Sequence, residues 1–100
     1  MSQPRSYQPS PLPDLELVRR AAKGDGQALA ALKERHDRTV YATAYAILGD
    51  STHAEHVSSE TFLEAWRTAG TYDPQHRVSA WLAAIARRRA TAVLANRAFA

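Results

Sequence analysis

The strongest candidates for chemistry lie near the end of the sequence, where a tryptophan and several arginines share one segment. Trp81 and Arg88 are seven residues apart, which places them on the same side of a helix because seven residues make about two turns. An indole ring can stack on or wedge against an unpaired base, while a guanidinium binds a phosphate or a base edge. The spacing therefore favours non-covalent recognition of nucleic acid. The alternative for Trp81 is a half-buried core tryptophan at the start of its helix.

The histidines are the other candidates, as metal ligands or acid–base groups. Only His53 and His56 lie at close helical spacing, and no third ligand is evident. His36 falls on an apolar stripe and is better explained as a core histidine with a polar partner, while His53 and His76 are expected to be exposed. We therefore expect no enzyme activity, no bound metal and no cofactor.

The charges are distributed unevenly along the chain. Every acidic residue lies between Asp14 and Asp73, and the charged residues after Asp73 are all arginines. A basic end of this kind is the electrostatic signature of a surface that faces phosphates. The alternative is a solvated basic helix without a partner.

Length and composition restrict the class of protein. One hundred residues, 45% of them apolar, are enough for one folded domain with a modest core. The sequence has no cysteine, no apolar stretch long enough to span a bilayer and no recognisable leader before a cleavage site. We therefore expect a soluble protein of the reducing cytoplasm.

Four helices are expected to position the candidate residues, because apolar side chains recur at intervals of three and four and no alternating pattern predicts a strand. The expected helices span residues 14–23, 27–48, 52–68 and 79–100. The sequence thus predicts a compact all-α bundle over residues 14–100. It follows a flexible, proline-rich tail over residues 1–13 that cannot bury enough apolar surface to fold.

Polar residues and glycines indicate where these helices begin and end. We expect Asp14 to cap the first helix and Ser79 to cap the fourth. Thr52, with Glu55 three residues later, has the pattern of a capping box at the start of the third helix. Gly49 is expected to end the long second helix.

The third helix separates into two faces at about 100° per residue. Its core face is expected to hold Ala54, Val57, Ser58, Thr61, Phe62 and Ala65. Its opposite face holds His56, Ser59, Glu60, Leu63 and Arg67. A leucine within a polar stripe can anchor a protein partner. The alternative is a single exposed leucine without a partner, which is common on protein surfaces.

The fourth helix has a similar division. Its buried side is expected to hold Leu82, Ile85, Ala86, Ala90 and Val93. Arg89 falls among these residues, so we expect its stem to pack and its guanidinium to reach water or pair with a carboxylate. The opposite face, with Trp81 and Arg88, is the better candidate for contact with DNA.

Three segments together resemble a known family. The sequences AEHVSSETFLEAWR, YDP and AWLAAIARRRA resemble the second region of bacterial sigma factors, most closely those of the extracytoplasmic-function (ECF) group. The resemblance covers about residues 14–97. It implies an all-helical domain that binds the clamp helices of the RNA polymerase β′ subunit. It also implies recognition of the promoter minus-ten element, on the non-template strand, while the DNA strands separate.

The resemblance assigns two surfaces to this chain. The polymerase-binding residues, here called the docking stripe, are Glu55, His56, Ser59, Glu60, Leu63 and Arg67. The DNA-binding residues, here called the reading surface, are Tyr72, Asp73, Gln75, His76, Arg77, Ser79, Trp81 and Arg88. Family members take flipped bases into pockets beside the loop, and the polymerase performs the catalysis.

This chain departs from the family pattern at several of these positions. His56 and Ser59 replace an acid and a glutamine, which implies differently tuned binding to polymerase. The loop before Trp81 is about one residue shorter than is common and lacks a usual glycine. Arg88 replaces an asparagine and Ala92 an acid or amide, so we expect an unusual promoter preference.

Two further expectations concern partners. An anti-sigma protein is expected to cover the face from His56 to Arg67 and exclude polymerase, and the alternative function is a regulatory module with this main partner. A complete ECF factor also has a C-terminal domain that reads the minus-thirty-five element. We therefore expect an excised N-terminal domain, or alternatively a partial sigma-like protein that needs a second subunit.

Overall fold

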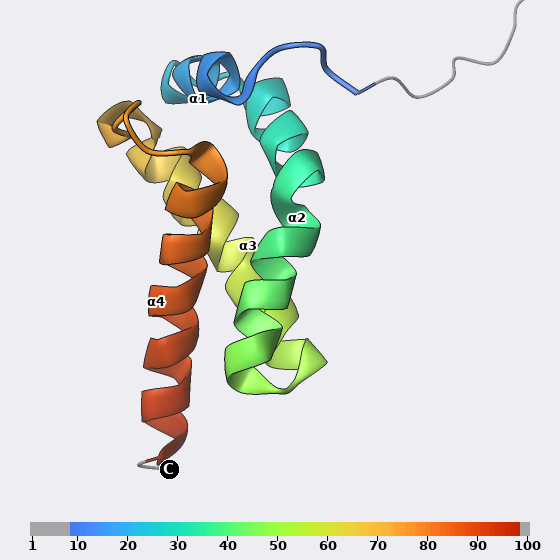
Figure 1. Ribbon diagram of the computed structural model, residues 1–100, viewed down its shortest axis with the longest axis vertical. Coiled ribbons are helices and arrows are strands. Elements are labelled where there is room, and N and C mark those ends of the chain that lie inside the picture. The colour runs from blue at the N-terminus through green and yellow to red at the C-terminus, as the bar shows by residue number, and fades with distance from the viewer. Residues whose placement is uncertain (1–8, 99–100) are drawn as a thin grey trace, which may run out of the picture.

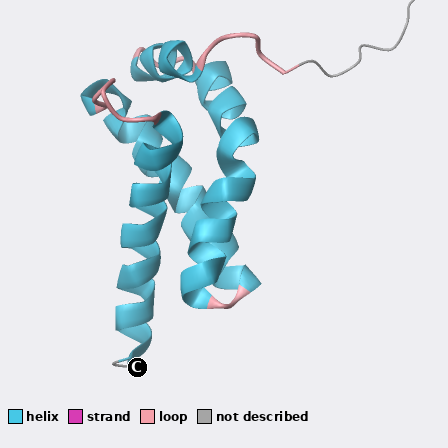
Figure 2. Ribbon diagram, in the orientation of Figure 1, coloured by secondary structure: helices cyan, strands magenta, loops and turns pink. Residues whose placement is uncertain are grey.

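The computed structural model describes residues 9–98, and it is built from helices (Figure 1). The elements are α1 (Asp14–Ala22), α2 (Gly26–Leu48), α3 (Ser51–Thr68), the short 3₁₀ helix η1 (Ala69–Thr71) and α4 (Val78–Ala98). The described residues contain no strand, as Figure 2 shows. The prediction of an all-α fold with a short, a long and two further helices is therefore confirmed.

The long helices α2, α3 and α4 lie side by side, and α1 crosses the end where α3 finishes and α4 begins (Figure 1). This arrangement places η1, just before the loop that leads to α4, against α1, although η1 and α1 are far apart in sequence. None of the helices within residues 9–98 combines the length and the apolar character needed to cross a membrane.

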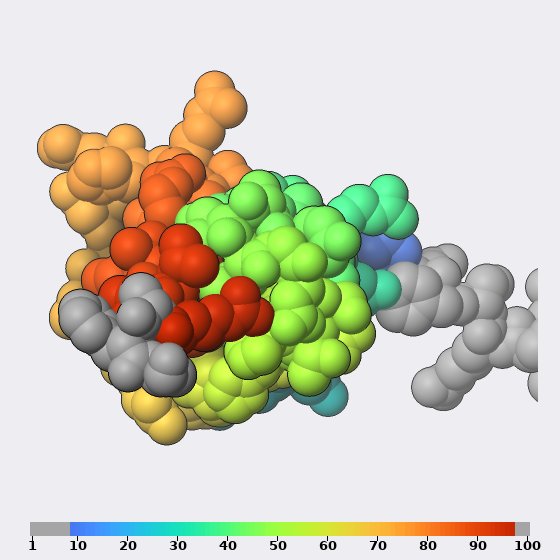
Figure 3. All heavy atoms as spheres, turned by 90° about the horizontal axis from the view of Figure 1, so that it is seen from below, coloured from blue at the N-terminus to red at the C-terminus, as the bar shows by residue number. Residues whose placement is uncertain are grey.

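The buried residues form two clusters at opposite ends of the bundle. The larger cluster lies beneath α1 and includes Leu17, Leu32, Phe62 and Leu82, each at most 3% exposed. The smaller cluster, at the end viewed in Figure 3, joins α2, α3 and α4 through Ala44, Leu48, Ala54, Val57 and Ala90. The large side chains therefore support the end of the molecule that carries the loop before α4.

The segment before α1 is only partly described. Of the tail predicted over residues 1–13, residues 1–8 lie outside the described residues. Within the rest, Leu12 packs against the larger cluster, and the carbonyl of Ser10 accepts a hydrogen bond from Arg35 Nη2 at 2.6 Å. These contacts attach residues 9–13 to the bundle.

The predicted cap at Asp14 is wrong. Pro13 occupies the N-cap position of α1, and no side chain caps that helix end. Asp14 instead accepts a hydrogen bond from Arg35 Nη1 at 3.0 Å, and its other oxygen lies 2.8 Å from His36 Nε2. Asp14 therefore links α1 to α2, and the half-buried His36 has the polar partner that the sequence predicted.

The predicted capping box at Thr52 and Glu55 is also wrong, because α3 begins one residue earlier. Asp50 is its N-cap and accepts hydrogen bonds from the backbone N–H groups of Thr52 at 2.8 Å and His53 at 3.3 Å. Gly49 ends α2 as predicted, at a φ of 65° that favours glycine. The adjacent glycine and aspartate thus turn the chain sharply from α2 into α3.

The fourth helix begins earlier than its predicted cap. It starts at Val78, and the backbone N–H of Trp81 donates to the carbonyl of Arg77 at 3.0 Å. Ser79 therefore lies inside the first turn rather than at the cap. Starting at Val78 buries that side chain in the larger cluster, which supplies a physical reason for the earlier start.

Candidate functional site

The predicted core face of α3 is confirmed residue by residue. Its buried residues are Ala54, Val57, Ser58, Thr61, Phe62 and Ala65. The two hydroxyl-bearing members have partners, since Thr61 Oγ1 donates to the carbonyl of Val57 at 2.7 Å and Ser58 Oγ donates to Asp37 at 3.1 Å. Helical periodicity alone therefore fixed which side of α3 faces the core.

The docking stripe consequently faces outward along α3. Glu55, His56, Ser59 and Arg67 are exposed, and Leu63 is 45% exposed. Glu60 is half-exposed, because its carboxylate turns toward α4. The stripe therefore combines one apolar side chain with polar groups on a single rigid helix.

A groove between α2 and α3 continues this surface onto the neighbouring helix. Glu55 and Ser59 of the stripe line the groove from α3. From α2 it is lined by Lys33, Glu34, Asp37, Arg38 and Tyr41. These α2 residues were not predicted to belong to this surface, because only tertiary packing makes the two helices adjacent.

The loop of the reading surface is a tight turn that stands out from the body of the molecule, as the orange segment in Figure 3 shows. Asp73 Oδ1 accepts from the N–H of Gln75 at 2.9 Å, and the carbonyl of Asp73 accepts from the N–H of His76 at 3.0 Å. The side chains from Asp73 to Arg77 are all exposed. Local hydrogen bonds thus hold the turn and leave its side chains accessible.

Tyr72 and Trp81 form the base of this loop. Their ring centroids are 4.9 Å apart with an interplanar angle of 50°, and both rings are half-buried against the larger cluster. The Tyr72 hydroxyl donates to the carbonyl of His76. Burial raises the pKa of Tyr72, and the carboxylates of Asp14 and Asp73 raise it further. Trp81 is therefore a half-buried core tryptophan whose remaining surface lies at the start of α4.

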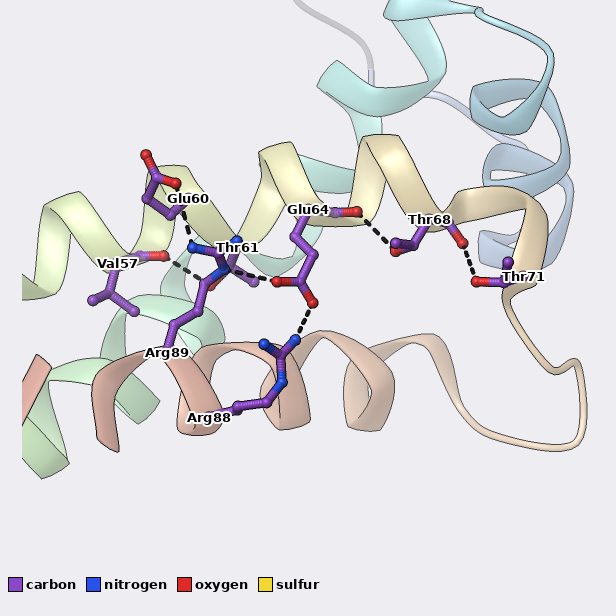
Figure 4. A network of polar contacts seen from close by, with 8 residues as sticks. All are labelled: Val57, Glu60, Thr61, Glu64, Thr68, Thr71, Arg88 and Arg89. Atoms are coloured by element: carbon purple, nitrogen blue, oxygen red, sulfur yellow. Dashed lines mark hydrogen bonds and ion pairs between the residues drawn. The ribbon is translucent and has the colours of Figure 1, made fainter. Parts of the chain in front are cut away.

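Arg88 and Arg89 meet two glutamates of α3 in a network that Figure 4 shows. Arg89 Nε donates to Glu64 Oε1 at 2.9 Å, and Arg89 Nη1 donates to Glu60 Oε2 at 3.3 Å. Arg88 Nη2 donates to the second oxygen of Glu64. The prediction that Arg89 pairs with a carboxylate is confirmed.

Glu64 also was not among the functional residues predicted from the sequence. It lies four residues after Glu60, a spacing that puts two carboxylates on neighbouring turns of one helical face. That spacing was the available signal for a double carboxylate site facing the arginines. It could not reveal the partners, because Arg88 and Arg89 are on a different helix.

A second ionic cluster anchors the last turns of α4. Arg97 Nη2 lies 3.0 Å from Asp50 Oδ2, and Arg97 Nη1 donates to the carbonyl of Leu48 at 3.2 Å. His53 Nδ1 lies 2.6 Å from the same Asp50 oxygen, and hydrogen bonds from the His53 side chain and backbone lower the pKa of Asp50. This cluster holds the end of α4 against the turn between α2 and α3.

The basic end of the sequence is therefore partly neutralised in the fold. Arg88, Arg89 and Arg97 pair with carboxylates, whereas Arg77 and Arg87 form no ion pair with any residue in the range 9–98. Within the same range, no three histidine or acidic side chains gather in a way that could hold a metal ion. The cationic surface is therefore concentrated on fewer side chains than the sequence indicates.

The chain is similar to proteins of one family. The family model described as Sigma-70 region 2 matches residues 32–99. The ECF RNA polymerase sigma factor SigK of Mycobacterium sp. (strain KMS) is 39% identical over 75 residues, which cover 74% of this chain and 39% of that protein. The ECF RNA polymerase sigma factor BldN of Streptomyces coelicolor is 43% identical over 74 residues, covering 73% of this chain and 28% of that protein.

A solved structure agrees with these matches. It is an NMR structure of an engineered region 2 of sigmaE in complex with GTAAAA, with a TM-score of 0.79 and 30% identity, and it covers 87% of this chain and 90% of that one. The part of this chain that matches the two curated relatives spans well under half of their length. From the matched family, the relatives and the shared fold, this chain belongs to the sigma-70 family and is a region 2 domain of the ECF group.

Proposed function

We propose that residues 14–100 form a promoter-opening domain that binds RNA polymerase through the docking stripe and minus-ten DNA through the reading surface. The domain belongs to a family of transcription initiation factors. Its place of action is then the cytoplasm, where polymerase and promoter meet. The domain supplies recognition, and the covalent chemistry of RNA synthesis remains with the polymerase.

The exposed loop carries this proposal. Side chains from Asp73 to Arg77 are accessible above the Tyr72 and Trp81 rings, and the fold is shared with a region 2 in complex with GTAAAA. Unstacking a base costs a few kcal/mol, and stacking it on an aromatic side chain returns about 1–3 kcal/mol. A loop that offers ring surface and cations therefore favours the opened strand over the duplex.

The docking stripe supports the polymerase half of the proposal. Leu63 is exposed between polar groups on one helix, and Glu55 and Ser59 of the same stripe line a groove toward α2. An apolar anchor with a polar rim suits a helical partner such as the β′ clamp helices. His56 and Ser59, which replace an acid and a glutamine of the family pattern, give this surface its own hydrogen-bonding character.

The polymerase half is tested by binding to isolated β′ clamp helices. Leu63→Asp should weaken this binding by about tenfold or more, because it puts a charge where an apolar anchor is buried. Leu94→Asp is the matched control, since Leu94 is 44% exposed and lies on α4 outside the stripe. Equal affinities for the two variants would remove the docking assignment.

The DNA half is tested with a single-stranded minus-ten oligonucleotide and fluorescence anisotropy. Arg77→Ala should weaken binding several-fold, by roughly the effect of one lost phosphate or base contact. Arg38→Ala, which removes an exposed arginine from α2, is the control for net charge. If both variants bind as the natural protein does, the DNA site lies elsewhere.

The expected unusual promoter preference follows from Arg88 and Ala92. Transcription from a library of randomised minus-ten sequences, with polymerase and this protein, measures that preference. A preferred sequence that matches ordinary ECF factors would contradict this part of the proposal.

An anti-sigma protein is a further proposed partner. Its helices would occupy the docking stripe, so it and the clamp helices should compete, and Leu63→Asp should weaken both. An anti-sigma protein that binds together with the clamp helices would exclude a shared site.

A further inference from the structure

Glu64 stands between the two proposed surfaces. Its backbone belongs to the helix that carries the docking stripe, and its carboxylate binds two consecutive arginines of α4. One oxygen accepts from Arg88 and the other from Arg89. The side chain is only 17% exposed, so this carboxylate is largely withdrawn from water and its charge is weakly screened.

Arg88 is held at one point and is otherwise open. Only its Nη2 contacts Glu64, and its side chain is 62% exposed. A guanidinium has five N–H donors in a fixed planar fork. Its remaining donors therefore stay available to a ligand, in an orientation that Glu64 fixes.

The glutamates also reduce the attraction of this region for phosphate. Two carboxylates, Glu60 and Glu64, face two guanidinium groups, Arg88 and Arg89, so the network has no net charge. Attraction to a nucleic-acid backbone depends on uncompensated cations. An arginine whose charge is neutralised by a carboxylate adds little general affinity for phosphate. If the carboxylate also fixes its orientation, the arginine can still donate to a base edge.

We propose that Glu64 is a positioning residue for Arg88 that sets sequence discrimination, by orienting the guanidinium while cancelling its general attraction for phosphate. This inference rests on the proposed function of the reading surface. Glu64 acts through Arg88 and does not itself touch DNA. Its removal should therefore raise general affinity and lower selectivity at the same time.

The test compares Glu64→Gln with the natural protein in binding to single-stranded minus-ten and scrambled oligonucleotides over a range of salt concentrations. Freeing one arginine for phosphate should steepen the plot of log affinity against log salt by about 0.7, the value for one contact on a single strand. Affinity for the scrambled strand should rise several-fold. The strand ratio, which is the affinity for the minus-ten strand divided by that for the scrambled strand, should fall.

Glu60→Gln is the matched control, because Glu60 contacts Arg89 and not Arg88 in the network. It removes the same charge and should leave the strand ratio of affinities unchanged. In Glu64→Gln combined with Arg88→Ala, the steeper salt dependence should disappear. A mere loss of charge or of stability would instead give similar results in Glu60→Gln and Glu64→Gln.

Glu64→Asp provides a second route to the test should the glutamine variant fold poorly. It keeps the charge with a shorter reach, so the strand ratio should fall while the salt dependence stays close to that of the natural protein. If Glu64→Gln and Glu64→Asp both leave the strand ratio unchanged, the positioning role is refuted. If the natural protein binds neither strand, or Arg77→Ala has no effect, the proposed reading surface has failed instead.

Discussion

The docking stripe and the reading surface differ in how their side chains are held. The stripe projects from one face of α3, and Leu63 within it makes no contribution to either buried cluster. On the reading surface, Trp81 packs on Tyr72 and the larger cluster, and Arg88 is bound to Glu64. A substitution at Leu63 can therefore change binding alone, whereas one at Trp81 also changes packing.

The difference has a physical origin in the place of each surface in the bundle. A helix that packs with one face leaves its other face free at no cost to the core. The reading surface lies where the loop, α1, α3 and α4 meet, so its aromatic rings complete the core beneath them. Replacing Leu63 on the outer face of α3 should therefore change binding without changing the free energy of unfolding. Replacing an aromatic ring at the base of the loop should change both.

The largest expected effect is that of Trp81→Ala. Removing a half-buried indole from the edge of the larger cluster should lower the free energy of unfolding by about 2–3 kcal/mol, below the range for fully buried aromatic residues. Urea denaturation measures this change, and Leu94→Ala serves as an exposed control on the same helix. A loss similar to that of Leu94→Ala would mean that Trp81 contributes little to the fold.

A smaller effect is expected for Tyr72→Phe, which keeps the ring contact with Trp81 and removes only the hydroxyl. The hydrogen bond to the carbonyl of His76 is then lost, which should cost about 0.5–1 kcal/mol. Chemical denaturation measures the cost, and Tyr45→Phe removes a hydroxyl from an exposed tyrosine of α2 for comparison. If Tyr72→Phe and Tyr45→Phe lower the free energy of unfolding equally, this hydrogen bond does not stabilise the loop.

The same hydroxyl gives the loop a dependence on alkaline pH. Because the pKa of Tyr72 is raised in the folded state, its contribution to stability is present below about pH 10 and is lost as the pH rises through the folded pKa. Melting temperatures of the natural protein and Tyr72→Phe should converge as the pH increases above about 10. Curves that remain parallel would exclude this linkage.

The smallest expected effect on stability is that of Leu63→Ala on the stripe. Its side chain is 45% exposed and belongs to neither cluster, so the free energy of unfolding should change by less than about 0.5 kcal/mol. Binding to the clamp helices should nevertheless weaken. A stability loss near that of Trp81→Ala would abolish the contrast between the two surfaces.

The faces of α3 show how far reasoning from the sequence can go. Its six core residues follow from a period of 3.6, because burial on one side of a helix is a local property of spacing. The caps show its limit, since Asp14, Thr52 and Ser79 all have side chains that can cap, and none of them occupies a cap. Asp14 pairs instead with Arg35 and His36, Asp50 occupies the N-cap of α3, and Val78, just before Ser79, is buried in the larger cluster.

The sequence by itself determined the helical class, the core side of α3 and the family, because these depend on periodicity and on residues close together in the chain. Only the tertiary structure decided which charges meet: Glu64 with Arg88 and Arg89, Asp50 with Arg97 and Asp14 with His36. Each of these pairs joins residues more than twenty positions apart. Their side chains meet only after the helices have packed, so no local pattern specifies them.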